Sequence, residues 1–398
     1  MRARKERAAK GAVDPSRSRS KSKSPRKIDR SLRRVVPPPP PPIASCANVL
    51  DFEVIARERL ERAFYDYYAG GAEDEITLAA NRGAFAEVFL RPRVLVDVSR
   101  IETSTTLLGT SVSMPVLIAP TAFHRLAHPD GELATAKAAG GARTLMVAST
   151  IATYTLEEIA RVATGPLWYQ LYVYKDRSLA RNLIQRAERA GYRALCLTVD
   201  TPCLGTRERD VRNRFTLPPG ILMRNFEAAG FDVASLGDSF HSYARRQLDC
   251  SLTWDSVAWL RSETKLPILL KGIIAAEDAT LAVQHGVDGV IVSNHGGRQL
   301  DGTEATLRAL PRVVDAVQGR AEVLMDGGVR RGTDVLKALA LGARAVLVGR
   351  PCLWGLAAAG EEGVGRVLEM FRQELTLAMA LCGCPEIGAI DRSLIASD

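Results

Sequence analysis

Eight short apolar runs, spread along roughly 240 residues, constrain the fold of this 398-residue chain more than any other feature. The runs are Pro115–Ala119, Thr144–Ala148, Leu167–Leu171, Ala194–Val199, Pro267–Leu270, Gly289–Val292, Glu322–Met325 and Ala345–Val348. They are apolar throughout and do not alternate with polar residues. This pattern predicts parallel strands that are covered on both faces.

Amphipathic segments with helical spacing separate the runs. They include Asp130–Ala139, Ser178–Ala190, Ala276–His285, Thr303–Val317 and Thr333–Leu341. Eight strand–helix units favour an α/β fold of the (β/α)8 (TIM) barrel type over an open doubly wound sheet, because no GxGxxG follows the first run. The pattern over Val49–Ala69 predicts an N-terminal helical segment. About 50 residues between Val199 and Trp254 predict an extended loop after strand 4.

The net charge of +8 comes from the N-terminus of the chain. Residues 1–36 hold 14 Lys or Arg and 3 Asp or Glu, which leaves 39 basic and 42 acidic residues for the rest. Six prolines follow at Pro37–Pro42, and apolar residues are scarce. We therefore predict a disordered basic and proline-rich tail over residues 1–45 and a single catalytic domain over residues 46–398. The slightly acidic body argues against nucleic acid as a partner, and activity is expected to survive removal of the tail.

Cysteine usage and hydropathy bear on the compartment. The seven cysteines form no CxxC pair and no Cys/His cluster, which fits a reducing compartment and no metal. No segment is long and apolar enough to span a bilayer, so no membrane partner is expected. There is no secretory signal, and Ile395–Asp398 is not a peroxisomal tripeptide, so we expect a cytoplasmic protein.

Candidate site residues, most of them polar or glycine, lie at the C-terminal end of each of the eight runs or just after it, where a barrel enzyme carries its active site. They are Pro120, Thr121 and Ala122; Ser149; Gln170 and Tyr172; Thr198 and Asp200; Lys271; Ser293 and His295; Asp326, Gly327, Gly328 and Arg330; and Gly349 and Arg350. A polar residue that caps one strand or helix is ordinary, but eight coincident positions are not. The sixth position continues through Gly296 and Gly297 to Arg298. An imidazole beside a fixed cation on a tight loop suggests proton transfer on an anionic substrate.

The last two strand ends indicate a phosphate site. Loops after strands seven and eight of such barrels bind phosphate with backbone amides and a helix N-terminus. Asp326–Gly332 and Gly349–Arg350 supply both glycines and guanidinium groups there. Lys271 at the fifth strand end is open to two interpretations. It could face a negative site on a cofactor ring, or it could form a Schiff base as in aldolase-like barrels.

These residues resemble the FMN-dependent L-2-hydroxy acid oxidases and dehydrogenases, the glycolate oxidase and lactate oxidase family. The resemblance runs from about Asp51 to Ala396. The motifs that carry it are Tyr65–Asp74, Ile118–Ala122, Tyr169–Asp176, Leu197–Pro202, Leu269–Gly272, Ser293–Asp301 and Asp326–Asp334. The resemblance implies FMN as the cofactor and a homo-oligomer, commonly a tetramer.

The resemblance also implies roles for individual residues. His295 would be the base that takes a proton from the substrate, and Asp200 would support its imidazolium form. Arg298 and Arg207 would hold the substrate carboxylate, and Tyr67 and Tyr172 would bind the substrate through their hydroxyls. Lys271 would stabilise the anionic reduced flavin. The residues expected to hold FMN are Pro120, Thr121, Ala122, Ser149, Gln170, Thr198, Lys271, Ser293, Asp326, Gly327, Gly328, Arg330, Gly349 and Arg350.

One departure from the family pattern bears on the substrate. Ile151 stands where glycolate oxidases carry a tryptophan that lines the substrate pocket. A smaller side chain leaves more room, so we expect lactate or a bulkier 2-hydroxy acid. Residues 201–252 lack the hydrophobic segment of the membrane-bound relatives, which favours a soluble enzyme. We expect O2 to reoxidise the flavin and form H2O2. The alternative is a soluble lactate- or mandelate-type dehydrogenase that reduces a cytochrome or quinone.

Overall fold

The computed structural model describes residues 42–230 and 247–396 of the protein. The chain divides into two units, Met1–Pro39 and Pro40–Asp398, and everything below concerns the second. The predicted disorder of residues 1–45 falls almost wholly outside the described residues and stays a prediction. Within that range Ile43–Ser45 forms a single 3-10 turn, η1.

Eight parallel strands close into a barrel in the order β10-β3-β4-β5-β6-β7-β8-β9. They are β3 (Val116–Ile118), β4 (Met146–Ala148), β5 (Leu167–Leu171), β6 (Leu195–Thr198), β7 (Ile268–Ile273), β8 (Gly289–Val292), β9 (Glu322–Asp326) and β10 (Ala345–Val348). Each lies on a predicted run, so the predicted (β/α)8 barrel is confirmed. A two-stranded hairpin, β1 (Thr105–Leu107) and β2 (Thr110–Val112), precedes the barrel in the chain.

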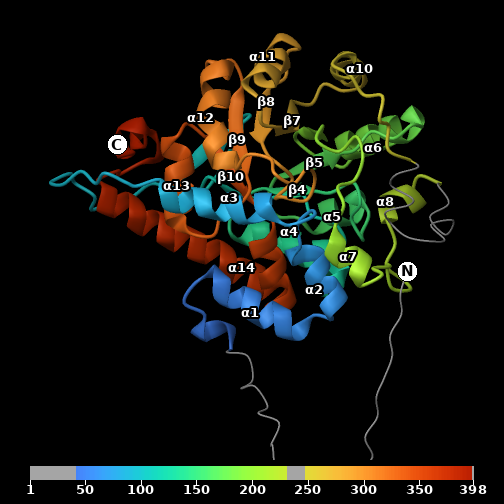
Figure 1. Cartoon of the computed structure of the whole chain (residues 1–398), viewed down its shortest axis with the longest axis horizontal. Helices are drawn as coiled ribbons and strands as arrows, with labels where there is room; N and C mark the ends of the chain where they lie inside the picture. Colours follow the sequence, from blue (N-terminus) through green and yellow to red (C-terminus); the bar gives the residue numbers. More distant parts are fainter. Residues whose placement is uncertain (1–41, 231–246, 397–398) are drawn as a thin grey trace, which may run out of the picture. The chain divides into compact units, whose positions relative to one another are not determined.

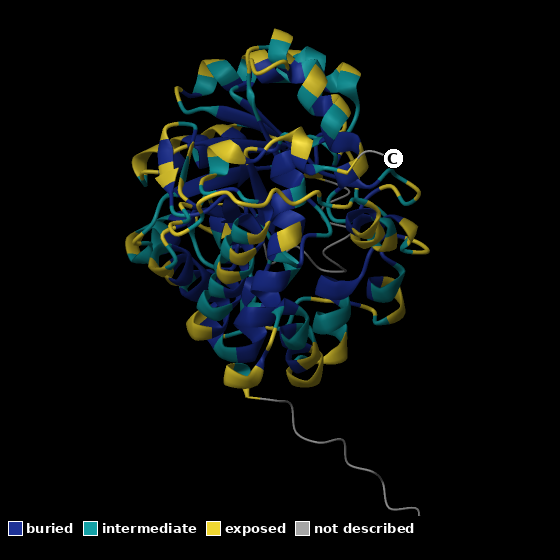
Figure 2. Ribbon diagram, turned by 90° about the vertical axis from the view of Figure 1, so that its left-hand side faces the viewer, coloured by how far each residue is buried: buried dark blue, intermediate teal, exposed yellow. Residues whose placement is uncertain are grey.

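The barrel helices lie between the strands in sequence. They are α4 (Gly131–Gly141), α5 (Leu156–Val162), α6 (Arg177–Arg189), α10 (Asp255–Glu263), α11 (Ala276–Gln284), α12 (Thr306–Val317), α13 (Gly332–Ala340) and α14 (Arg350–Cys382). Figure 2 shows the buried residues concentrated on the strands and on the inner faces of the helices, with exposed residues outward. The apolar strands are therefore covered on both faces, as their composition predicts.

Side chains alternate between the two faces of each barrel strand. Leu117, Val147, Trp168 and Leu269 belong to one compact apolar cluster, which also includes Leu107 of the β1–β2 hairpin. Their neighbours along the strands belong instead to the large cluster shared with the helices. The small cluster therefore fills the barrel interior, and the hairpin lies against it. Since the period is two, the residue two positions after each interior apolar side chain also faces inward.

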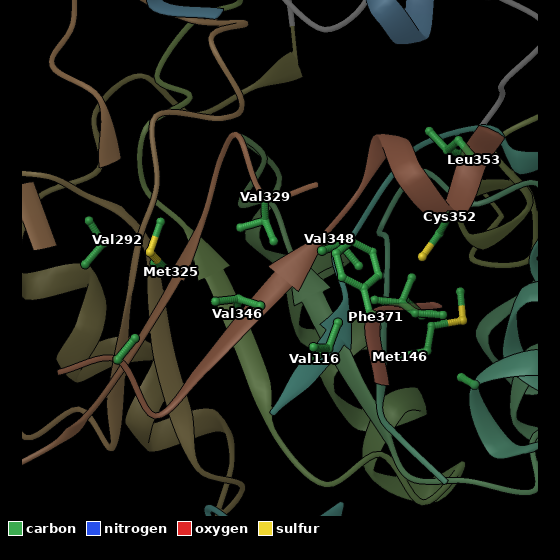
Figure 3. Close-up of a cluster of buried hydrophobic side chains, with 14 of the residues drawn as sticks. Val116, Met146, Val292, Met325, Val329, Val346, Val348, Cys352, Leu353 and Phe371 are labelled. Atoms are coloured by element: carbon green, nitrogen blue, oxygen red, sulfur yellow. The ribbon is translucent and has the colours of Figure 1, made fainter. Parts of the chain in front are cut away.

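The outer faces of β3, β4 and β10 pack against α14. Figure 3 shows Val116, Met146, Val346 and Val348 from these strands with Phe371 of α14. All five side chains are at most 2% exposed. This packing anchors α14, which is kinked at Ala359 and Gly360 and whose first residue, Arg350, follows the last barrel strand after Gly349 alone.

The predicted N-terminal helical segment over Val49–Ala69 is present. It consists of two helices, α1 (Val49–Arg59) and α2 (Arg62–Ala69). The break falls at Leu60 and Glu61, whose ψ angles of 144° and 142° are extended. Phe52 and Ile55 bury the inner face of α1 against α14, and Figure 1 shows these two helices side by side. A further helix, α3 (Ile76–Glu87), follows.

The predicted long connection after strand 4 of the barrel is present. It carries α7 (Glu208–Arg212) and α8 (Arg224–Glu227), and residues 231–246 within it lie outside the described residues. Leu248 returns to the barrel, where it forms an antiparallel bridge with Tyr174 just after β5. Among the described residues, no helix combines the length and the apolar character that a membrane crossing requires.

Candidate active site

A single cavity lies where the barrel strands end, and nearly all of the predicted site residues line it. About 1190 Å³ of space inside it is free of protein atoms, part of it open to solvent. The predicted residues in its wall are Tyr67, Pro120, Thr121, Ala122, Ser149, Tyr172, Arg207, Lys271, His295, Arg298, Asp326, Gly327, Gly328, Arg330, Gly349 and Arg350. The wall takes residues from strand ends all around the barrel, so the space suits a ligand larger than a small acid alone.

The floor of the cavity continues the interior columns of the barrel. Gln170 follows the interior residue Trp168 of β5 by two positions, and Thr198 follows the interior residue Cys196 of β6 in the same way. Gln170 Nε2 donates a hydrogen bond of 3.0 Å to Thr198 Oγ1. Ser149 Oγ donates to Gln170 Oε1 at 3.4 Å. Gln170, Thr198 and Ser293 are buried behind the residues of the cavity wall, so they act on its shape and polarity through their neighbours.

Lys271 is buried at the end of β7 with an acidic partner. Its Nζ lies 3.0 Å from Asp326 Oδ2 and donates to Ser293 Oγ at 2.9 Å. Burial lowers the pKa of Lys271, but the charges of Asp326 and Asp200 outweigh burial and raise the pKa to about 12. A lysine that stays protonated is a poor nucleophile, so the geometry favours a fixed positive charge over a Schiff base.

His295 pairs with Asp200 across the cavity mouth. His295 Nδ1 lies 2.9 Å from Asp200 Oδ1. Burial raises the pKa of Asp200, but the hydrogen bond from His295 and the charge of Lys271 outweigh it, so the net pKa is lowered. An ionised carboxylate only accepts hydrogen bonds, so Nδ1 carries the proton and Nε2 is the free basic atom. Nε2 lies 3.4 Å from the Tyr172 hydroxyl.

The protonation state of His295 suits a base at neutral pH. Burial lowers the pKa of its imidazole, while Asp200 acts in the opposite direction without cancelling that effect. The neutral ring is therefore the resting form. Once it accepts a proton at Nε2, the nearby carboxylate of Asp200 stabilises the resulting positive charge.

The backbone conformation fixes the positions of His295 and Asp200. His295, Gly296 and Gly297 all have positive φ angles of 57°, 66° and 73°. A side chain at Gly297 would lie 2.6 Å from the backbone nitrogen of Leu78, so only glycine fits there. The predicted sharp turn is confirmed. Gly272 plays a matching part, because a Cβ at that position would lie 2.6 Å from the Cβ of Asp200.

Two further cations face the same space as His295. Arg298 donates to the carbonyls of Tyr67 at 2.6 Å and Gly70 at 3.0 Å, and its guanidinium lies 5.0 Å from the centre of the Tyr67 ring. Burial and the charge of Arg207 lower the pKa of Arg298 to about 10. The Nε of Arg207 is buried without a hydrogen-bond partner among the described residues. This pair of guanidiniums suits a carboxylate, which takes two parallel hydrogen bonds.

A second pair of arginines, Arg330 after β9 and Arg350 after β10, lines the cavity. The amide groups of Arg330 and Arg331 both donate to Asp334 Oδ2, which fixes the glycine-rich loop ahead of α13. Burial, then the nearby charge of Arg82, lowers the pKa of Arg330 to about 10. Burial and the charges of Arg298 and Arg330 lower the pKa of Arg350 well below its ordinary value.

These arginines fit a phosphorylated, anionic cofactor. Buried guanidiniums that depress one another's pKa lack sufficient negative charge nearby. Arg330 Nε is also buried without a partner among the described residues. Gly327, Gly328 and Gly349 expose backbone next to these cations. Arg350 donates to the carbonyls of Tyr68, Gly296 and Gly70, which fix its guanidinium in place. A phosphate at this end of the barrel would supply the missing negative charge and accept from Arg330 Nε and from backbone amides.

A buried network supports the cofactor side of the cavity from behind. Thr121 Oγ1 lies 2.6 Å from His124 Nε2, and His124 Nδ1 lies 2.9 Å from Thr135 Oγ1. Thr135 Oγ1 donates to the Gly131 carbonyl, so it accepts from His124 Nδ1, and Nε2 accepts from Thr121. Burial lowers the pKa of His124, which keeps this arrangement at neutral pH. The sequence interpretation missed His124, although it lies three residues after Thr121.

One wall of the cavity is apolar. It consists of Ile151 from the loop after β4, Tyr174 after β5, and Leu204, Met223 and Leu248 from the long connection. Only Ile151 was identified from the sequence. Tyr174 could have been found because it lies two residues after Tyr172. Met223 and Leu248 carry no sequence signal, since irregular chain brings them to the barrel. Within residues 42–230 and 247–396, no group of three or more His, Cys, Asp or Glu side chains could hold a metal ion.

The fold and this site define a (β/α)8 barrel enzyme with room for a phosphorylated cofactor. The family model described as FMN-dependent dehydrogenase matches residues 56–397. Glycolate oxidase of Spinacia oleracea is 56% identical over 355 residues, which is 88% of this chain and 96% of that protein. L-lactate oxidase of Nostoc sp. is 52% identical over 360 residues, which is 89% of this chain and 99% of that protein.

A solved structure gives the same result. The crystal structure of mandelate oxidase with (S)-4-hydroxymandelic acid superposes with a TM-score of 0.83 at 44% identity, and the match covers 87% of this chain and 97% of that one. The chain belongs to the FMN-dependent 2-hydroxy acid oxidase family. FMN is its cofactor, and the oxidation of a 2-hydroxy acid is its reaction class.

Proposed function

We propose that the protein oxidises L-2-hydroxy acids with an apolar side chain, L-lactate or larger, to 2-oxo acids, with O2 as the acceptor and H2O2 as the product. The observation that carries this proposal is that three groups surround one cavity. They are the His295–Asp200 base, the two guanidiniums of Arg298 and Arg207, and the apolar wall at Ile151. The first two suit a 2-hydroxy acid, and the third suits an apolar substituent on its α-carbon.

His295 acts as the base. Its Nε2 takes a proton from the substrate, and Asp200 stabilises the imidazolium through the hydrogen bond at Nδ1. Tyr172 lies beside Nε2 and, together with Tyr67, donates to oxygen atoms of the substrate. Burial raises the pKa of Tyr172 to about 12, so its hydroxyl keeps its proton and is a donor.

Arg298 and Arg207 bind the substrate carboxylate. Their position relative to Nε2 of His295 orients the α-carbon and its hydroxyl toward the base. The apolar wall of Ile151, Met223 and Leu248 receives the side chain and excludes water from that side.

The remaining residues hold the cofactor. FMN, when bound, accepts the two electrons that leave the substrate and passes them to O2. Arg330, Arg350 and the glycine amides would hold its phosphate, and Ser149, supported from behind by Gln170 and Thr198, would lie on the side of its ring system. Lys271 places a fixed positive charge against it, which favours a cofactor that gains negative charge on accepting electrons.

Anaerobic mixing tests the reaction. The purified protein should be yellow and should lose its flavin absorbance on addition of L-lactate, then regain it in air. Protein that takes up no FMN, or whose absorbance no L-2-hydroxy acid changes, would contradict the proposal. H2O2 measured per mole of 2-oxo acid tests the acceptor. A ratio near one supports O2, and a ratio near zero with fast reduction of a cytochrome or quinone would overturn it.

A further inference from the structure

Two exposed cysteines lie next to each other at the cavity mouth. Cys203 follows β6 and Cys250 ends the long connection, and both have free, exposed thiols. Cys250 Sγ donates to the carbonyl oxygen of Pro202 at 2.9 Å. That oxygen and the Cα of Cys203 belong to one planar peptide unit, so Cys250 Sγ lies within about 6 Å of the Cys203 Cα. Adding the reach of the Cys250 side chain bounds the separation of the two Cα atoms at about 8.5 Å, against about 4.4–6.8 Å in a disulfide, so bond formation needs rotation of the exposed thiols and at most a small shift of the backbone.

The backbone around each cysteine is fixed to a different side of the cavity. Gln299, in the loop that carries His295, donates from Nε2 to the carbonyls of Cys203 and Asp200, both at 2.8 Å. On the other side, the amide of Asp249 donates to the Val173 carbonyl at 3.2 Å. The neighbours of the two cysteines, Leu204 and Leu248, both line the cavity. A covalent bond between the cysteines would therefore connect the two sides of the mouth.

We propose that Cys203 and Cys250 form an oxidisable dithiol site, which a peroxide converts to a disulfide that restricts access to the cavity. The oxidant class is the one that the proposed reaction releases, so its supply in turnover rests on the proposed function. Formation of the bond by added peroxide does not.

The chemistry balances with one peroxide. A thiolate of the pair attacks a peroxide oxygen, the O–O bond breaks, and a sulfenic acid and one water result. The second thiol attacks that sulfur, the S–S bond forms, and the second water leaves. Two electrons and two protons pass from the dithiol to the peroxide. An added thiol reductant reverses the step by thiol–disulfide exchange.

Peptide mapping tests the bond. The holoenzyme is treated with added H2O2, alkylated and digested with trypsin without reduction. The expected product joins peptide 194–207 to peptide 247–261. Peptide 194–207 also contains Cys196, which is buried and whose thiol pKa burial raises to about 12, so fragmentation should place the link at Cys203. A link at Cys196, sulfinic acid without a link, or a bond between two chains would overturn the proposal.

Kinetics test the consequence. Peroxide-treated protein should lose roughly fivefold or more in kcat/KM for L-lactate, and dithiothreitol should restore it. Cys203→Ser and Cys250→Ser should each keep the untreated activity and become insensitive to peroxide, whereas Cys384→Ser, a buried thiol elsewhere, should remain sensitive. A linked peptide with unchanged kcat/KM would overturn the effect on access. If no substrate is oxidised at all, the proposed function fails, while the peptide map still decides the disulfide.

Discussion

Asp200 controls the pH range in which His295 can act. His295 can accept a proton only when its imidazole is neutral. The value of kcat/KM should therefore be constant at pH values above the lowered pKa of His295 and should fall as the pH drops through that pKa. The charge of Asp200 raises the pKa of His295 against the effect of burial. Asp200→Asn should therefore move the acid limb to lower pH, and it should lower the plateau by roughly a hundredfold or more because the imidazolium loses its support.

The pH profile of kcat/KM for L-lactate checks this expectation. Thr201→Val is the matched control, because it removes only the 2.9 Å hydrogen bond to Asp200 Oδ1 and leaves the charge in place. It should leave the acid limb nearly unchanged. A shift of the limb to higher pH in Asp200→Asn would mean that the titrating base is a different residue.

Ile151 sets the room available to the substrate side chain. It is 7% exposed and faces the cavity beside Met223. Ile151→Trp should fill this space and raise KM for (S)-mandelate by roughly tenfold or more, because each displaced apolar group costs about 1–3 kcal/mol. The KM for glycolate, which has no side chain, should change little. Ile151→Leu conserves volume and serves as the control. Equal losses for both substrates would contradict this role.

At the level of elements, the alternation along the strands made much of the site predictable. Once eight buried strands are recognised, the residues at their C-terminal ends are candidates, and Ser149, Lys271 and Asp326 follow from position alone. Because side chains alternate along a strand with a period of two, these residues face the barrel interior like the apolar residues two positions before them. The pairing of His295 with Asp200 does not follow from the pattern, because it depends on two loops meeting. That pairing was implied by the family resemblance.

The parts that escaped prediction lack a periodic signal. The break between α1 and α2 falls at Leu60 and Glu61, and neither residue is a glycine or proline that would mark it. Met223 and Leu248 reach the cavity through irregular chain, so their place depends on tertiary contacts. Local sequence reports the face of a strand or helix, but it does not report where a long connection returns.

Glu132 on α4 joins the loops after β3 and β4. It is fully buried, and its carboxylate accepts from the amide of His124 at 3.1 Å, from the amide of Thr153 at 2.9 Å and from the Thr153 hydroxyl. Glu132→Ala would leave these donors unsatisfied, at a cost of about 3 kcal/mol or more. These loops carry Thr121 and Ile151, so affinity for FMN should fall as well.

Thermal melting of the holoenzyme and titration of the apoprotein with FMN measure both effects. Glu87→Ala is the control, since Glu87 and its partner Arg308 are each 55% exposed and such a pair contributes about 0–1 kcal/mol. It should leave both the melting temperature and the FMN affinity nearly unchanged. Equal losses in the two variants would show that Glu132 has no special structural part.

For the whole molecule, the basic tail is expected to be dispensable for catalysis. The residues that line the cavity come from the segment between Tyr67 and Leu353. A variant that lacks residues 1–41 should keep kcat and KM. It should also lose any salt-dependent binding to heparin that the full chain shows, because the 14 basic residues of the tail lie within residues 1–36. A large loss of kcat would give the tail a part in catalysis.

The homo-oligomer that the family resemblance implies has a candidate contact surface. Val94 and Leu95 are 81% and 103% exposed in the segment between α3 and β1, and Leu377 and Leu381 are 60% and 66% exposed on α14. The amide of Arg93 donates to the Cys382 carbonyl, so the two groups are neighbours. Exposed apolar side chains gathered in this way mark protein–protein contacts. We propose that this surface binds a second copy of the chain.

Sedimentation velocity measures the outcome. The wild type should sediment as an oligomer of the 43.1 kDa chain, and the double variant Leu95→Asp, Leu381→Asp should shift to smaller species, because burying two carboxylates without partners is costly. Val211→Asp introduces the same charge at a 65% exposed position on α7 and should leave the oligomer intact. A wild-type monomer would exclude the oligomer. An oligomer that survives the double substitution would place the contact on another face of the barrel.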